Sequence, residues 1–215
     1  MRTSRPHIDV KYWYENVAVR KRGKIPHWHV PNGIYFVTYR LAGSLPRHVE
    51  HQIALMRAKL IAARKDDYDG AEARAIERDI FRQTEAQLDQ SDGDCWLRDH
   101  EVAGVVISAF EHGDADEYEL IAFVVMPNHV HVVFRLLAGE LHEVVKRWKS
   151  YTAHRANEIL KRAGVFWQSD YFDVLIRDSE QLERTITYVL NNPAKAGLVG
   201  WPHMRTFPER IARMI

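Results

Sequence analysis

The stretch "YELIAFVVMPNHVHVVFRLL", residues 118–137, decides the fold that this sequence predicts. Both of its halves are rich in β-branched and aromatic residues, which is typical of strands. Pro127 and Asn128 stand between the halves, and a Pro-Asn pair is a turn signal. We therefore expect two antiparallel strands joined as a hairpin, with further elements of the sheet on both sides of it.

Strand and helix patterns alternate outward from this hairpin. In chain order the sequence predicts a strand at 33–43, two helices within 46–91, a helix at 98–113, the hairpin, a helix at 141–163, short strand-like pieces at 165–168 and 172–178, and a helix at 179–191 that Pro193 stops. Four strands with helices between them indicate an α+β domain, a ferredoxin-like antiparallel four-stranded sheet with helices packed on one face. We expect one domain over 1–215 that begins with an irregular basic and aromatic arm at 1–31.

Composition narrows the class of protein but not its function. The chain has 215 residues, 46% of them hydrophobic, and a formal net charge of +1. Basic residues gather at 20–24 and 146–155, but charge alone favours solvated helix faces over a binding surface. The single cysteine, Cys95, excludes an internal disulfide and a zinc site built from cysteines, and it suits the cytoplasm. Neither a signal peptide nor a membrane-spanning run is predicted.

Two histidines stand on one face of the second hairpin strand. Side chains alternate along a strand, so His129 and His131 point the same way, about 6.5–7 Å apart. Two imidazoles at that separation can converge on a divalent metal ion. Two hydrogen-bonded histidines on a half-exposed strand explain the pair equally well. A histidine-triad hydrolase is excluded, because its nucleophile would stand where this chain has Val133.

A tyrosine and an asparagine lie off the apolar stripe of the last helix. At about 100° per residue, Tyr188 and Asn192 share a face one turn apart. A surface tyrosine beside a helix-ending asparagine is the alternative interpretation. Tyr151 is the rival tyrosine, but it falls on the apolar stripe of its own helix, which predicts a core position. The stripe of the last helix consists of Leu182, Ile186, Val189 and Leu190.

Four linked motifs resemble a known family. They are "VVMPNHVHVVF" at 124–134, "RWKSYTAHRAN" at 147–157, "GVFWQSDYFDVLIRD" at 164–178 and "YVLNNPAKAGL" at 188–198. In their order and approximate spacing they are similar to the REP-associated tyrosine transposases, which are single-tyrosine HUH transposases. The resemblance covers most of 33–198, and it implies a ferredoxin-like sheet.

The resemblance assigns roles to particular residues. The histidine–hydrophobe–histidine motif is matched by His129, Val130 and His131, and the nucleophilic tyrosine by Tyr188. The polar side chain that completes the metal site one turn later is matched by Asn192, where some relatives have glutamine. The implied cofactor is Mg²⁺ or Mn²⁺. The stretch 46–91 is longer than a minimal member of the family needs, so it is expected to be a helical insertion.

The implied activity is metal-dependent cleavage and rejoining of single-stranded DNA at palindromic, hairpin-forming repeats through a 5′-phosphotyrosine intermediate. The resemblance favours a monomer over a dimer. Two other functions stay open: a non-catalytic regulator that binds structured DNA or RNA on the same fold, and a metal-dependent hydrolase of another substrate. The expected DNA contacts, for which solvated faces are the alternative, are Arg20, Lys21, Arg22, Arg147, Lys149 and Arg155.

Overall fold

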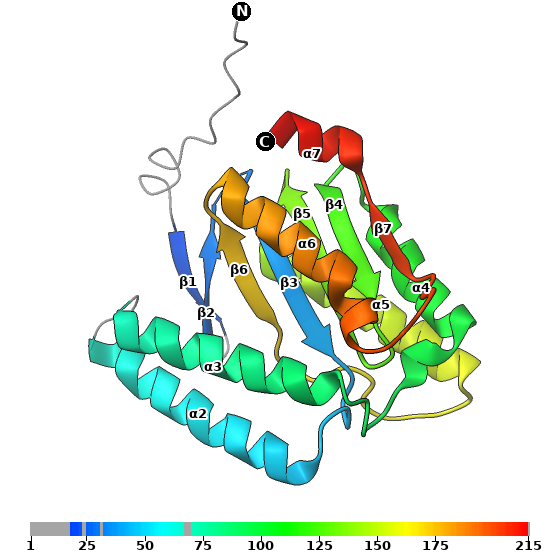
Figure 1. Cartoon of the computed structure of the whole chain (residues 1–215), viewed down its shortest axis with the longest axis horizontal. Helices are drawn as coiled ribbons and strands as arrows, with labels where there is room; N and C mark the ends of the chain where they lie inside the picture. The colour runs from blue at the N-terminus through cyan, green and yellow to red at the C-terminus, as the bar shows by residue number, and fades with distance from the viewer. Residues whose placement is uncertain (1–17, 23–24, 31, 67–69, 215) are drawn as a thin grey trace, which may run out of the picture.

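A five-stranded antiparallel sheet forms the centre of the computed structural model (Figure 1). The structure describes residues 18–22, 25–30, 32–66 and 70–214. The sheet has the strand order β6-β3-β5-β4-β7, and every neighbouring pair is antiparallel. Its strands are β3 (Ile34–Arg40), β4 (Tyr118–Val125), β5 (His129–Leu136), β6 (Phe172–Ile176) and β7 (Met204–Thr206).

The first four of these strands, numbered along the chain, lie in the order 4-1-3-2. This is the order of a ferredoxin-like split βαβ sheet, and the predicted α+β class with a ferredoxin-like antiparallel sheet is confirmed. The fifth strand, β7, pairs with β4 through Met204, Arg205 and Thr206, and the sequence did not predict it. Three residues are too few to show the period-two alternation from which strands are recognised.

The predicted hairpin is confirmed, with β4 and β5 joined by a three-residue turn. The backbone of this turn is fixed on both sides. The Leu41 N–H donates to the Asn128 carbonyl at 2.8 Å, and the Leu97 N–H donates to the Pro127 carbonyl at 3.1 Å. Asn128 is fully buried. The residues that precede the histidines are therefore held rigidly in place.

Helices cover both faces of the sheet, not one face as predicted. Helices α4 (His100–His112) and α5 (Leu141–Ile159) pack behind the sheet as Figure 1 is drawn, and α6 (Ser179–Lys195) crosses its front. The alternation of β5 explains the two layers, because Val132 belongs to the core with α4 and α5 and Val133 to the core with α6. The two histidines share the α6 face with Val133.

The stretch 46–91 forms two helices, as predicted. Helices α2 (Arg47–Asp66) and α3 (Ala71–Leu88) pack against each other around a small core of their own that includes Leu60 and Leu88. In Figure 1 the pair runs across the lower ends of β6 and β3. The last turn of α3 contacts the buried histidines through Glu85, so this segment contributes a side chain to the site.

Two predicted helix ends are wrong. Helix α6 continues through Pro193 to Lys195, and its N-cap is Asp178, whose carboxylate accepts the Gln181 N–H at 2.7 Å. Near a helix end a proline interrupts little, because few backbone bonds remain to be made. Helix α5 ends at Ile159, four residues earlier than predicted.

Smaller predicted features also differ from the structure. Tyr151 was expected in the core, but its side chain is 53% exposed. The piece at 165–168 forms no strand, and only Trp167 makes a single bridge, to Leu41. Two further short elements are a 3-10 helix, η1 (Trp96–Arg98), and α7 (Pro208–Met214).

The predicted irregular arm contains a regular segment. Strands β1 (Ala18–Arg22) and β2 (Ile25–His29) form an antiparallel ladder of their own, which corrects the prediction for these residues. Residues 1–17 of the arm lie outside the described part of the chain. None of the described helices has the length and apolar character that a bilayer span requires.

Candidate metal and nucleophile site

The two histidines of β5 face each other in a fully buried position. The Nε2 atoms of His129 and His131 lie 3.0 Å apart, and their rings are inclined at 76°. Each ring is held through its other nitrogen: the Nδ1 atom of His131 lies 2.7 Å from the hydroxyl of Thr38, and that of His129 lies 2.6 Å from the amide oxygen of Asn128. Both Nε2 atoms therefore point into one small space.

A carboxylate from α3 completes this group. Oε2 of Glu85 lies 3.0 Å from Nε2 of His131 and 4.0 Å from Nε2 of His129. Glu85 is only 4% exposed. Among the residues that the structure describes, these three form the one cluster of at least three histidine, cysteine or acidic side chains with metal-ligand spacing.

The electrostatics of the cluster suit a cation. Burial lowers the pKa of His129 to about 3, with a further lowering by His131 that Glu85 opposes, so this imidazole is neutral near pH 7. Burial alone would raise the pKa of Glu85. The charge and hydrogen bond of His131, helped by His129 and Tyr188, outweigh burial and lower this pKa to about 2. Neutral imidazole and ionised carboxylate are the forms that bind metal ions.

The predicted nucleophile lies at the same place. The hydroxyl of Tyr188, on α6, donates a hydrogen bond to Oε2 of Glu85. Its ring is 5.4 Å from the ring of His131 and packs edge-on against Phe36 at 6.0 Å. Burial, followed by the charge and hydrogen bond of Glu85, raises the pKa of Tyr188 well above its usual value. The neutral phenol is thus the resting form in the metal-free protein.

The predicted amide ligand is beside the tyrosine. Asn192 is 1% exposed, and neither its amide oxygen nor its amide nitrogen has a hydrogen-bond partner. Its proximity to Tyr188 lowers the pKa of the phenol, against the larger raising effects of burial and Glu85. The structure therefore brings His129, His131 and Tyr188 together, with Asn192 beside the tyrosine, and adds Glu85, which the sequence did not predict.

The geometry fits a divalent metal ion. Two ligand atoms about 2.1 Å from an octahedral cation, at right angles, are about 3.0 Å apart, which matches the His129–His131 and His131–Glu85 separations. Buried polar atoms without partners are rare in folded proteins, yet Oε1 of Glu85 and both side-chain polar atoms of Asn192 have none. A bound ion with its water ligands would satisfy such atoms. Two histidines and a carboxylate leave positions open for substrate oxygens.

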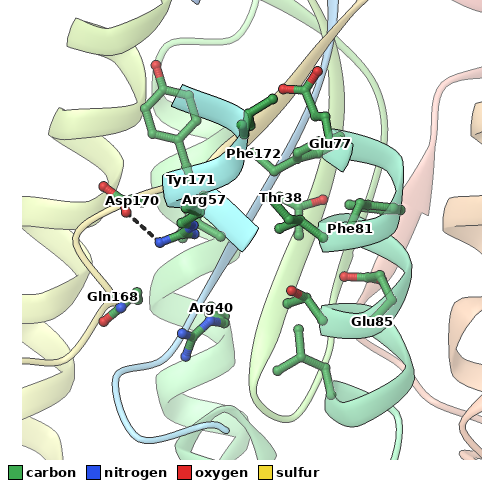
Figure 2. Close-up of a pocket in the computed structure, with 15 residues that line it drawn as sticks. Thr38, Arg40, Arg57, Glu77, Phe81, Glu85, Gln168, Asp170, Tyr171 and Phe172 are labelled. Atoms are coloured by element: carbon green, nitrogen blue, oxygen red, sulfur yellow. Dashed lines mark hydrogen bonds and ion pairs between the residues drawn. The ribbon is translucent and has the colours of Figure 1, made fainter. Parts of the chain in front are cut away.

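A crevice borders this cluster on the side of the helical pair. Figure 2 shows it between α3 and the segment before β6, with Arg57 and Asp170 paired at 2.6 Å across it and Glu85 on its α3 wall. The cavity measures about 60 Å³, and Thr38 and Glu85 line it as well as touching the histidine site. That volume holds a few water molecules, so the crevice can hydrate the site.

The predicted DNA-contacting cations that can be placed are engaged within the protein. Arg147 pairs with Glu117, and Arg155 pairs with Glu158 one turn along α5. These two arginines are about half exposed, and such surface pairs contribute little stability and exchange readily. Lys149 differs, because its ammonium donates to the carbonyls of Gln168 and Ser169 at 2.6 and 2.7 Å. The side chains of Arg20, Lys21 and Arg22, in β1, lie outside the described part of the structure.

The buried cluster predicts a loss of stability in acid. The pKa of His129 is about 6.5 when unfolded and about 3 when folded, so between these values the unfolded chain binds a proton that the folded chain does not. The free energy of unfolding should therefore fall as pH drops from 6.5 toward 3, by up to about 1.4 kcal/mol per pH unit. Glu85 adds to the fall between 4.5 and about 2.

Urea unfolding of the metal-free protein, measured at several pH values between 7 and 4, tests this expectation. The variant His129→Gln should show a shallower pH dependence than the wild type. An equal slope in both proteins would mean that His129 does not titrate as its burial requires.

The family described as "Transposase IS200 like" matches residues 101–192, a segment that contains His129, His131, Tyr188 and Asn192. The REP-associated tyrosine transposase of Escherichia coli (strain K12) is 29% identical over 101 residues, which are 45% of this chain and 58% of that protein. A provisionally named REP-associated tyrosine transposase of Haemophilus influenzae is 23% identical over 104 residues, 40% of this chain and 57% of that protein.

The chain thus matches less than two thirds of the length of either curated relative. Among solved structures, it is similar to that of the REP-associated tyrosine transposase bound to a REP hairpin, with a TM-score of 0.49 and 17% identity over 91% of this chain and 87% of that one. The sequence matches confirm the resemblance that the four motifs predicted: part of this chain is similar in sequence to REP-associated tyrosine transposases, and its residues 101–192 match the model of the IS200-like transposase family.

Proposed function

We propose that this protein is a metal-dependent enzyme that cleaves and rejoins single-stranded DNA, with Tyr188 as its nucleophile. The observation that carries the proposal is the meeting of two groups from distant parts of the chain. The Tyr188 hydroxyl bonds to the same Glu85 oxygen that lies 3.0 Å from His131. A tyrosine at the ligand atoms of a cation site is placed to attack a phosphate that the cation holds.

The chemistry follows from the groups present. The Tyr188 oxygen attacks the scissile phosphorus, a bond from phosphorus to the phenolic oxygen forms, and the bond to the 3′-oxygen breaks. The phenolic proton is released and the departing 3′-oxygen gains one, so the step is balanced. Its products are a 5′-phosphotyrosine and a free 3′-hydroxyl. Because the phosphodiester energy is kept in the covalent intermediate, attack by a 3′-hydroxyl can rejoin the strand.

The bound cation would supply Lewis-acid catalysis, polarising the phosphate and stabilising the 3′-oxygen. We assign its ligands to His129 and His131 together with Glu85, and we retain Asn192 as the neighbouring amide that could bind a metal-bound water. Mg²⁺ or Mn²⁺ is the expected ion, because a carboxylate and open positions for phosphate oxygens suit these metals. Packing of the phenol against Phe36 and His131 orients its oxygen toward Glu85, one of the residues that would hold the cation.

The proposed substrate is single-stranded DNA that folds into a hairpin at a palindromic repeat. Its support is the likeness to the REP-associated tyrosine transposase of Escherichia coli and the arrangement of nucleophile and cation ligands. A monomer in the cytoplasm is the expected working form.

One assay separates this function from its rivals. A labelled hairpin oligonucleotide with a single-stranded flank is incubated with the protein and Mn²⁺ and resolved on a denaturing gel. We expect a covalent protein–DNA adduct that a chelator abolishes. Metal-dependent cleavage without an adduct would favour a hydrolase. Tight binding without cleavage would favour a non-catalytic regulator, and either result would overturn the proposal.

The basic residues of α5 give a separate prediction. Replacing Arg147 and Arg155 together with alanine should weaken hairpin binding and reduce the salt slope of the logarithm of the binding constant by about 1–2, since each arginine is proposed to contact a phosphate. Arg20, Lys21 and Arg22 are proposed to act in the same way. Lys149→Ala should affect binding less, because its ammonium is held by backbone carbonyls. Fluorescence anisotropy at several salt concentrations measures the slope, and an unchanged slope would contradict the assignment.

A further inference from the structure

Asn128 links the histidine pair to the end of α3. Its amide nitrogen donates to the Leu88 carbonyl at 2.9 Å, and its amide oxygen lies 2.6 Å from Nδ1 of His129. Leu88 is the last residue of α3, three residues after Glu85. A fully buried amide thus bridges the helix that carries the carboxylate and one of the two imidazoles.

The directions of these hydrogen bonds follow from chemistry alone. A carbonyl oxygen can only accept, so the group that faces Leu88 must be the NH₂ of Asn128, and its oxygen must face His129. That oxygen is also only an acceptor, so Nδ1 of His129 must carry the proton. In neutral imidazole Nε2 then has the lone pair. The carbonyl of Leu88, acting through Asn128, therefore fixes which nitrogen of His129 is free to bind a cation.

His131 is held differently. Its Nδ1 faces the hydroxyl of Thr38, and a hydroxyl can either donate or accept. With Nδ1 as acceptor, Nε2 of His131 can donate to His129 or to Glu85, which both lie 3.0 Å away. With Nδ1 as donor, Nε2 is free for a cation. The Thr38 contact permits both tautomers of His131, whereas the Asn128 contact permits one tautomer of His129.

We propose that Asn128 is a positioning residue with two actions: it locks His129 in the tautomer whose Nε2 lone pair faces the cation site, and it ties the last turn of α3 to that site so that Glu85 reaches it. The role of Asn128 in catalysis rests on the proposed function, whereas its hydrogen bonds do not. Buried partners of metal-ligating histidines generally orient the ring and fix its tautomer. Here the same side chain also positions Glu85, the proposed third ligand. Docking of α3 is therefore coupled to the tautomer of His129 that can bind a cation.

Two substitutions separate the two actions. Asn128→Asp keeps an oxygen acceptor for the His129 Nδ1–H but loses the donor to Leu88. Asn128→Leu keeps a similar volume and loses both contacts. Thr38→Val is the matched control, because it removes the hydroxyl partner of His131 and leaves Asn128 and His129 in contact.

The first measurement is ¹⁵N NMR of the metal-free protein labelled at histidine, at pH 7.5. In the wild type we expect the His129 Nδ1 signal to be that of a protonated nitrogen and the Nε2 signal that of an unprotonated one. Asn128→Asp and Thr38→Val should keep this pattern, and Asn128→Leu should lose it. If Asn128→Leu retained the Nδ1–H tautomer, or if the wild type lacked it, the tautomer lock would be refuted.

The second measurement is amide hydrogen exchange over residues 85–89. Both Asn128 variants should exchange faster there than the wild type, while exchange in Thr38→Val should be unchanged. Equal exchange in Asn128→Asp and the wild type would refute the tie to α3. If Asn128→Leu does not fold, the Asn128→Asp variant and the wild-type tautomer still decide both actions.

The third measurement is the affinity for Mn²⁺, which tests whether the hydrogen bonds of Asn128 matter for cation binding. Titration with Mn²⁺ should show binding about 10–100-fold weaker in Asn128→Leu, the usual cost of losing such a partner. Wild-type affinity in that variant would overturn the positioning role. A wild-type protein that binds no Mn²⁺ would instead contradict the proposed function, while the NMR and exchange results would still stand as the test of the hydrogen-bond chain.

Discussion

Replacing Tyr188 with phenylalanine is expected to abolish the covalent protein–DNA adduct and to lower strand cleavage by about 10³-fold or more, as removal of a nucleophile does. Phenylalanine lacks only the attacking oxygen. It keeps the edge-on packing against Phe36 and the ring contact with His131, so the site around it should remain folded. The measurement is the denaturing-gel adduct assay with Mn²⁺ and a labelled hairpin.

Tyr151→Phe is the matched control for this experiment. Tyr151 is exposed on α5, and its ring makes no contact with the cluster in the described structure. That variant should form the adduct at the wild-type rate. An adduct that persists in Tyr188→Phe, or one that disappears in Tyr151→Phe, would show that the nucleophile has been assigned to the wrong tyrosine.

Replacing Glu85 with glutamine should weaken Mn²⁺ binding by about 100-fold or more, because the neutral amide removes the only anionic ligand of the cluster. Glutamine is close in volume, so α3 should still dock on the sheet. Isothermal titration calorimetry measures the affinity directly and requires no DNA. Glu72→Gln is the control, since Glu72 is exposed in the first turn of the same helix.

Comparison with Asn192→Ala decides between the two candidates for the third ligand. We expect a smaller loss of affinity in Asn192→Ala than in Glu85→Gln, because Asn192 lies beside Tyr188 and Glu85 lies at the histidines. The reverse order would support Asn192 as the third ligand, the assignment that the family resemblance implied. Wild-type affinity in Glu85→Gln would contradict the account of the cation site given above.

The hairpin could be predicted because local pattern and global fold agree there. Alternation along β5 separates Val130, Val132 and Phe134 from the two histidines, and the structure buries those three residues with α4 and α5. Tyr188 could be placed off the apolar stripe of its helix for the same reason, since one face of α6 supplies the core. The alternation of β5 and the apolar stripe of α6 are both short-range periodic patterns, which can be recognised in a single sequence.

Glu85 could not be found in this way. It stands in a helix that contains two other glutamates, Glu72 and Glu77, and no spacing within α3 distinguishes a buried carboxylate from a solvated one. Its role depends on where the helical pair docks, which is a tertiary property. Asn128, in the turn before the histidines, is the residue that connects the site to the end of α3. Its hydrogen bond to Leu88 joins residues forty positions apart, and no local sequence rule predicts a contact of that range.

Tyr151 shows the opposite error. Its spacing from Trp148 placed it on the apolar stripe, yet Trp148 is buried and Tyr151 is exposed. The apolar stripe of a helix is about 100° wide, and the sheet does not bury all of it. Residues at the margin of the stripe therefore remain in contact with solvent. Periodicity identifies the buried face of a helix better than it identifies the edges of that face.

The most direct test of the central claim is a crystal structure of the protein soaked with Mn²⁺, examined for anomalous scattering at the metal. We expect one strong peak about 2.0–2.3 Å from Nε2 of His129, Nε2 of His131 and Oε2 of Glu85, with the hydroxyl of Tyr188 facing it. A peak coordinated by Asn192 with Glu85 turned away, or no peak between the two histidines, would contradict it.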